Sequence, residues 1–205
     1  MSGSDETTRL EGLWAGDFGD EYVDRNARAG DGRQEFWTDR LAGIEVATAL
    51  EVGCNVGANL RWLAEALGQA NVAGVDINEK AVEQLSQQLP EADVRVGPAR
   101  DLPFPDASFD LTFTTGVLIH QPLEELPHVM AEIVRCSSRY VLCGEYYAEE
   151  LVEVPYRGQE GALFKQDFGG LYLREYPELQ QVDTGFLPAS EGVWDDITWW
   201  LLEKG

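Results

Sequence analysis

The stretch Leu50-Glu-Val-Gly-Cys-Asn-Val-Gly-Ala-Asn59 decides the fold, because a short apolar strand runs here into a glycine-containing turn that opens a helix. Gly53 permits a sharp turn and a close approach of a ligand to the backbone, since glycine has no Cβ. Asn55 is among the few residue types that tolerate a positive φ. Gly57 is expected to start the helix and to leave its first backbone N–H groups directed at a ligand. The strand is predicted over residues 47–53, and the helix by apolar residues at the spacing of one helix face: Leu60, Leu63, Ala64 and Leu67.

This β-α unit recurs along the chain, which is the pattern of a parallel sheet with crossover helices. Strands are predicted over 71–76, 93–96, 109–115 and 140–144, helices over 81–89, 123–134 and 165–176, and closing strands over 179–187 and 196–202. The sequence therefore predicts an α/β fold: a Rossmann-like, doubly wound, seven-stranded sheet with helices on both faces. The sheet is expected to be mostly parallel, with a terminal antiparallel hairpin.

A chain of 205 residues fits a single domain with one continuous core. Residues 1–45 are polar with interspersed aromatics and are expected to form an N-terminal helical cap of the same domain, whose main part spans 46–205. The acidic start Met1-Ser-Gly-Ser-Asp-Glu6 and the lack of a long apolar run argue against a signal peptide and a membrane span. A cytoplasmic protein without membrane partners is expected.

Composition narrows the range of ligands. Acids outnumber bases 37 to 15, giving a net charge of −22, so the surface is expected to repel nucleic acid and anionic lipid. Cys54, Cys136 and Cys143 are odd in number and form no Cys-x-x-Cys pair, which suggests neither a disulfide framework nor a metal site. A small-molecule ligand is therefore predicted, bound by a monomer or a homodimer.

A carboxylate stands at the tip of the second predicted strand, in Val75-Asp-Ile-Asn78, 23 residues after Gly53. Asp76 can accept hydrogen bonds from both hydroxyls of a ribose, the geometry that a nucleoside cofactor requires. Alternatively, Asp76 caps the following helix. Its position beside the glycine turn favours ribose binding, with Ile77 and Asn78 in the same site.

The pattern Glu51-x-Gly53-x-x-x-Gly57 resembles motif I of the class I methyltransferases rather than a dinucleotide G-x-G-x-x-G, because positions 55 and 58 are Asn and Ala. The resemblance implies S-adenosylmethionine as cofactor and S-adenosylhomocysteine as product. Residues 96–110 resemble the segment that holds adenine in such enzymes, and 114–120 resemble motif IV, beside the methionine moiety. The residues thereby implicated in cofactor binding are Glu51, Gly53, Cys54, Asn55, Gly57, Ala99, Arg100, Thr115 and Gly116.

Catalytic candidates follow the fourth and fifth predicted strands. His120 can act as a general base near neutral pH, or it only caps a strand-to-helix turn. Glu145 and Tyr146, with Tyr147, are expected to project toward the crevice, where tyrosine faces can contact a sulfonium cation. Simple core packing is the alternative. His128 is expected at the surface.

The N-terminal segment supplies further candidates. Trp14, Phe18 and Tyr22 can fold over the cofactor and exclude water, and Arg25 is available for the carboxylate of the cofactor.

A more specific resemblance runs through nearly the whole chain. Segments 13–22, 113–120, 135–140, 145–147, 154–158, 163–169 and 195–199, together with the motif I loop, are similar to the methylases associated with pseudaminic acid biosynthesis. The resemblance implies S-adenosylmethionine binding in a bacterial or archaeal small-molecule pathway.

Three functions compete on this sequence. The leading hypothesis is an S-adenosylmethionine-dependent methyltransferase that transfers methyl by SN2 displacement to oxygen or nitrogen of a small, sugar-like acceptor. The alternative is cyclisation of S-adenosylmethionine to azetidine-2-carboxylate and methylthioadenosine, which some proteins similar to this group perform. The third is a cofactor-binding regulator without turnover.

Overall fold

The computed structural model describes residues 3–26 and 30–205. Met1 and Ser2, part of the acidic start that argues against a signal peptide, lie outside the described residues, as do residues 27–29 of the predicted helical cap. Within the described chain, no helix combines the length and the apolarity that crossing a bilayer requires.

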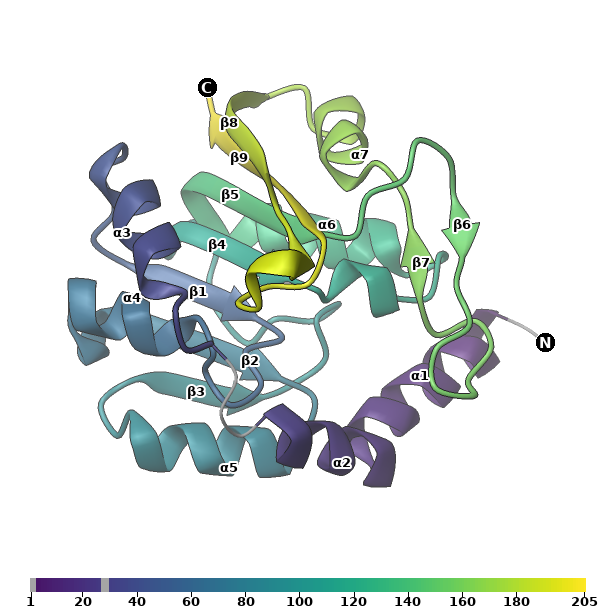
Figure 1. Cartoon of the computed structure of the whole chain (residues 1–205). Helices are drawn as coiled ribbons and strands as arrows, with labels where there is room; N and C mark the ends of the chain where they lie inside the picture. The colour runs from purple at the N-terminus through teal and green to yellow at the C-terminus, as the bar shows by residue number, and fades with distance from the viewer. Residues whose placement is uncertain (1–2, 27–29) are drawn as a thin grey trace.

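A seven-stranded sheet forms the centre of the molecule (Figure 1), with strand order β3-β2-β1-β4-β5-β9-β8. The first five strands in chain order are parallel, whereas β9 is antiparallel to β5, and β8 is antiparallel to β9. The predicted fold class, including the terminal antiparallel hairpin, is confirmed. The strands are β1 (Ala49–Val52), β2 (Val72–Asp76), β3 (Asp93–Val96), β4 (Phe109–Thr115), β5 (Ser137–Glu145), β8 (Leu179–Leu187) and β9 (Ile197–Lys204).

Helices cover both faces of the sheet, because neighbouring residues of one strand send their side chains to opposite faces. Leu50 belongs to the core on the side of α6 and α7, whereas Ala49 belongs to the core on the side of α3 and α4. The helices that pack on the sheet are α3 (Gln34–Ala42), α4 (Leu60–Leu67), α5 (Glu79–Gln88), α6 (Leu126–Cys136) and α7 (Phe168–Glu175). Short 3₁₀ turns are η1 (Gln69–Asn71), η2 (Leu118–His120) and η3 (Ala189–Glu191).

Two N-terminal helices, α1 (Gly3–Ala15) and α2 (Asp17–Asn26), are fixed at the end of β2. The Asn78 side-chain amide donates to the Trp14 carbonyl at 3.1 Å and to the Asp20 carboxylate at 2.9 Å. A small ribbon of β6 (Val152–Glu153) and β7 (Phe164–Lys165) follows β5 and lies near α1 (Figure 1). The Arg9 guanidinium donates to the Glu160 carbonyl at 2.9 Å, which joins this helix to the ribbon.

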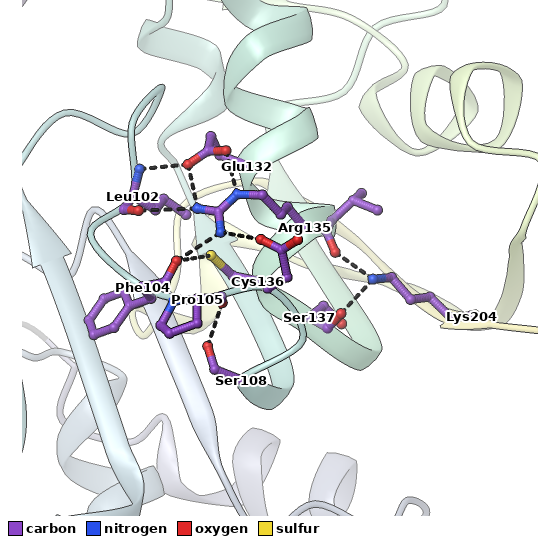
Figure 2. A network of polar contacts seen from close by, with 11 residues as sticks. Leu102, Phe104, Pro105, Ser108, Glu132, Arg135, Cys136, Ser137 and Lys204 are labelled. Atoms are coloured by element: carbon purple, nitrogen blue, oxygen red, sulfur yellow. Dashed lines mark hydrogen bonds and ion pairs between the residues drawn. The ribbon is translucent and has the colours of Figure 1, made fainter.

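A polar network on α6 fixes the segment that follows β3 (Figure 2). Arg135 donates to the backbone carbonyls of Leu102 and Phe104, and Glu132 accepts the Leu102 N–H at 2.7 Å. Lys204 of β9 donates to the Val134 carbonyl in the last turn of the same helix. These bonds hold the backbone next to the adenine-side residues that the sequence predicts.

Candidate functional site

A cavity of about 560 Å³ opens where β1, β2 and β4 end, a volume in the range of small-molecule sites. This is the edge at which doubly wound sheets bind their ligands. Of the predicted site residues, those that line the cavity are Trp14, Tyr22, Arg25, Glu51, Gly53, Cys54, Asn55, Asp76, Ile77, Asn78, Ala99, Thr115, Gly116, His120 and Tyr146.

The glycine turn after β1 has the backbone that the sequence predicts. Gly53 has φ +74°, and a Cβ there would lie 2.3 Å from a methyl of Val117. Asn55 takes a positive φ of +45°. The Gly53 N–H donates to the Val75 carbonyl at 2.7 Å, and the Asn55 N–H donates to the Asp76 carboxylate at 2.8 Å. The turn is therefore tied to the tip of β2.

Asp76 presents its carboxylate to the cavity while holding two backbone amides. One oxygen accepts the Asn55 N–H and the other accepts the Asn78 N–H at 2.9 Å, which leaves lone pairs on both for further donors. Burial raises the pKa of Asp76, while these hydrogen bonds oppose the shift. The residue that caps α5 is instead Asn78, whose side chain accepts the Ala81 N–H. The alternative of a helix-capping Asp76 is therefore wrong.

Glu51 is a buried carboxylate with one oxygen unused. Its Oε1 accepts from the Asn59 amide at 2.6 Å, and Oε2 has no partner within the described residues. Burial raises the pKa of Glu51 to about 8. Because an unpartnered buried carboxylate oxygen is costly, this position suits a cationic or hydrogen-bond-donating ligand group.

Arg33 and Asn59 also line the cavity, and the sequence reasoning missed both. The Arg33 guanidinium donates to the Asn59 side-chain oxygen at 2.9 Å and lies 4.0 Å from the centre of the Trp194 ring. Burial lowers the pKa of Arg33. Asn59 stands within the decisive motif, but nothing local in the sequence indicates that Arg33, 26 residues earlier, contacts it. The predicted Arg25 is more exposed and is paired with Glu21 at 3.6 Å.

An aromatic cluster closes one side of the cavity. The Trp14 ring lies 4.6 Å from that of His120, 5.4 Å from Tyr22 and 6.3 Å from Tyr156, measured between centres. His120 Nδ1 is 2.6 Å from the Ala162 carbonyl, which can only accept, so Nδ1 carries the proton and Nε2 the lone pair. Burial lowers the pKa of His120 to about 4. The imidazole is consequently neutral near pH 7 and a weak base.

A second polar cluster combines residues from three distant segments. Burial, the neighbouring Asp195 charge and a hydrogen bond to that carboxylate raise the pKa of Tyr146 well above its ordinary value. Burial and the neighbouring Tyr156 and Asp195 raise the pKa of Tyr22 to about 12. Tyr156 and Asp195, which the sequence did not single out, thus join the predicted tyrosines at the cavity.

Five of the residues that the sequence predicts at the site do not line the cavity: Phe18, Gly57, Arg100, Glu145 and Tyr147. Glu145 is fully buried behind it, and its carboxylate accepts the backbone N–H groups of Val117 and Ile119 at 3.2 and 3.3 Å. The expectation that Glu145 and Tyr146 share one crevice is wrong, since successive strand residues point to opposite faces. Tyr147 is exposed and also lies outside the lining.

The other two corrections concern Gly57 and Arg100. Gly57 does not start the helix: its N–H donates to the Cys54 carbonyl at 2.9 Å within a turn, and α4 begins at Leu60. A Cβ at Gly57 would lie 2.4 Å from Leu85, so this glycine permits packing of α5. Arg100, whose backbone is expected to help bind adenine, is absent from the cavity lining, and its side chain forms an ion pair with Glu11 at 2.7 Å.

Comparison with known proteins agrees with this geometry. Residues 49–139 match a family model described as "Methyltransferase domain". The 27-O-demethylrifamycin SV methyltransferase of Amycolatopsis mediterranei is 32% identical over 136 residues, which are 62% of this chain and 49% of that protein. A phthiotriol/phenolphthiotriol dimycocerosates methyltransferase of Mycobacterium leprae is 34% identical over 88 residues, 42% of this chain and 32% of that protein. The chain thus spans at most about half the length of these relatives.

Solved structures share the fold at low identity. The 1,6-didemethyltoxoflavin-N1-methyltransferase of Burkholderia thailandensis, crystallised with S-adenosylhomocysteine, superposes with a TM-score of 0.78 at 16% identity, covering 100% of this chain and 91% of that one. The magnesium protoporphyrin IX methyltransferase of Synechocystis, also with S-adenosylhomocysteine, gives 0.72 at 16% identity over 97% and 99%.

The fold is therefore shared with these solved methyltransferases, and residues 49–139 match a methyltransferase domain.

Proposed function

We propose that this chain binds S-adenosylmethionine in the cavity at the ends of β1, β2 and β4 and transfers its methyl group to a small-molecule acceptor. The proposal rests on a set of buried polar atoms that have no hydrogen-bond partner among residues 3–26 and 30–205 and belong to residues lining that cavity: Trp14 Nε1, Glu51 Oε2 and Asn55 Oδ1. Buried polar groups are almost always hydrogen-bonded, so these atoms fit a polar ligand in contact with them.

The residues present fit the parts of this cofactor. Asp76 would accept the ribose hydroxyls, with its free lone pairs facing the cavity. Glu51 would accept from the α-ammonium group, and Arg33 would bind the α-carboxylate beside it. Backbone groups at Pro98 and Ala99 would hold the adenine, as both line the cavity.

When bound, the cofactor supplies an electrophilic methyl group on a sulfonium. The side chains of this chain would align the acceptor for attack on that methyl group. Tyr146 is held by Asp195 with its hydroxyl protonated, so it orients the acceptor by hydrogen bonding. His120 offers an unprotonated Nε2, but with a pKa of about 4 it suits hydrogen-bond acceptance better than abstraction of a weakly acidic proton.

The acceptor class is the finer part of the proposal. We propose an oxygen or nitrogen nucleophile on a small, sugar-like molecule, with the pathway of the pseudaminic acid-associated methylases as the leading context. Support comes from the resemblance of segments such as 154–158 and 195–199, which contribute Tyr156 and Asp195 to the cavity.

Binding and product analysis test the proposal. Calorimetry is expected to show uptake of S-adenosylhomocysteine by the wild-type protein and a loss of at least about tenfold in affinity for Asp76→Ala. Asp110→Asn is the matched control, because Asp110 also accepts two backbone N–H groups, from Ala47 and Thr48, but at the start of β4. Folded wild-type protein without measurable affinity contradicts the proposal.

Incubation with S-adenosylmethionine separates the competing reactions. Release of S-adenosylhomocysteine that depends on an added acceptor supports methyl transfer. Methylthioadenosine released without acceptor indicates cyclisation instead, and cofactor binding without turnover across acceptors indicates a regulator.

A further inference from the structure

The segment between β4 and α6 forms a large part of the cavity wall. Residues 115–117 and 119–122 all line it, including Thr115, Gly116 and His120. Such a connection has few regular backbone hydrogen bonds of its own, so its conformation depends on what holds it from behind.

Glu145, at the end of the neighbouring strand β5, holds this segment. Its two carboxylate oxygens each accept one amide, Oε1 from Val117 at 3.2 Å and Oε2 from Ile119 at 3.3 Å. Val117 in turn packs against Gly53, and His120 is fixed on its other side by the Ala162 carbonyl. One buried carboxylate thus connects β5 to the wall of the site.

The surroundings of Glu145 make this arrangement unusual. Its side chain is fully buried, and no ion pair to it occurs within residues 3–26 and 30–205. The titratable groups that face it are the Cys143 thiol of β5 and the Tyr172 hydroxyl of α7, and burial raises the pKa of both well above their ordinary values. Both groups stay neutral, so the carboxylate is stabilised by the backbone N–H groups of residues 117–119 and by the Thr114 hydroxyl.

We propose that Glu145 is a positioning residue: its ionised carboxylate holds the segment 115–122 in the conformation that binds the cofactor. This inference rests on the proposed function, because it assumes that the cavity takes S-adenosylmethionine. Protonation would turn one acceptor oxygen into a donor facing a backbone donor, which releases one of the two amides. Burial raises the pKa of Glu145 to about 7, so the transition falls near neutral pH.

Calorimetric titration with S-adenosylhomocysteine tests the role through its pH profile. At about pH 6, wild-type protein and Glu145→Gln are expected to bind within about twofold of each other, because Glu145 is then mostly protonated. At about pH 8 the wild type is expected to bind about tenfold more tightly, the effect of one charge-assisted hydrogen bond. The ratio of the two affinities at each pH cancels the effect of Glu51 and Asp76 titration, because both proteins contain these residues.

Asp110→Asn is again the control. It replaces a carboxylate that accepts two backbone N–H groups at the start of β4, the end of the strands away from the cavity. Its affinity ratio to the wild type is expected to stay near one at both pH values. Equal affinity of wild type and Glu145→Gln at pH 8 overturns the inference, as does an equal loss in Asp110→Asn.

A measurement on the wild-type protein alone decides the case if Glu145→Gln does not fold. The amide nitrogen shifts of Val117 and Ile119 are expected to titrate together, with one midpoint near pH 7. The Leu102 amide, bonded to Glu132, is expected not to follow that midpoint. Val117 and Ile119 amides that do not titrate, or that titrate at different midpoints, overturn the inference whether or not the cofactor binds.

Discussion

Individual carboxylates at the site differ mainly in what surrounds them. Glu51 accepts from the Asn59 amide while its Oε2 has no hydrogen-bond partner in the described parts of the chain, whereas Asp76 holds two backbone amides. Burial opposes ionisation of both, but only Asp76 has two backbone donors that offset it. In the unliganded protein, ionisation is therefore less favourable for Glu51 than for Asp76. The free energy of unfolding is expected to depend on whether Glu51 is ionised.

The pH dependence of stability tests this view of Glu51. Its folded pKa of about 8 lies above the ordinary 4.5, so between these pH values the folded state retains a proton that the unfolded chain has lost. The contribution to stability is complete below about pH 4.5 and disappears as pH rises through 8. Glu51→Gln removes this loss while keeping an oxygen for Asn59.

The melting temperature of Glu51→Gln, relative to wild type, is consequently expected to increase by several °C between about pH 5 and about pH 8, at about 2–4 °C for each kcal/mol. Thermal unfolding of the unliganded proteins measures it, with the exposed Glu91→Gln as control. A relative melting temperature that stays flat or falls with pH would show that Glu51 ionises normally in the fold.

The helix α1 contributes to the wall of the cavity. Trp14 at its end contacts His120 and Tyr156, and Arg9 in its middle donates to the ribbon at Glu160. The helix therefore bridges the ribbon and the segment after β4. If the cofactor binds as proposed, the aromatic end of α1 would exclude water from its sulfonium.

Substitution at Trp14 tests the contribution of this helix. Trp14→Ala removes the ring from His120 and opens the cavity, so the affinity for S-adenosylhomocysteine is expected to fall by about fiftyfold. Trp14→Phe keeps a ring but removes the N–H, and a loss of about fivefold is expected. Calorimetry provides the affinities, with Trp62→Phe as control, because Trp62 donates to the Gly30 carbonyl outside the cavity lining. Unchanged affinity in Trp14→Ala would mean that α1 does not cover the cofactor.

The whole molecule carries a large excess of negative charge. The net charge of the chain is −22. Most ion pairs of the described residues involve at least one well-exposed side chain. Exposed pairs contribute little, so repulsion among the remaining acids destabilises the folded state at low ionic strength.

Salt is therefore expected to stabilise this protein. Raising sodium chloride from about 0.05 to about 1 M shortens the screening length from about 14 to about 3 Å, and the melting temperature at neutral pH is expected to rise by several °C. The same titration near pH 4.2, where the net charge approaches zero, is the control and should show little change. A melting temperature that falls with salt at pH 7 would indicate that ion pairs outweigh the repulsion.

The sheet, the glycine turn and the position of Asp76 follow from the sequence without any knowledge of packing. These features depend on residues close together in the chain. They are short apolar runs separated by stretches of helical periodicity, a turn with positive φ at Gly53, and a carboxylate at the end of β2. Local chemistry is enough to predict them, because strand and turn preferences act over a few residues.

Which polar side chains reach the cavity depends on the three-dimensional packing. Glu145 and Tyr146 are neighbours in the chain, yet Glu145 binds the backbone of the segment 115–122 from behind while Tyr146 lines the cavity, because successive strand residues point to opposite faces. Arg33 lies directly before α3, Tyr156 lies between β6 and β7, and Asp195 lies just before β9. Only the packing of these segments brings the three side chains to the same cavity as Glu51, His120 and Tyr146. Side-chain direction at a strand end and contacts between distant segments depend on register and packing, which no short stretch of sequence encodes.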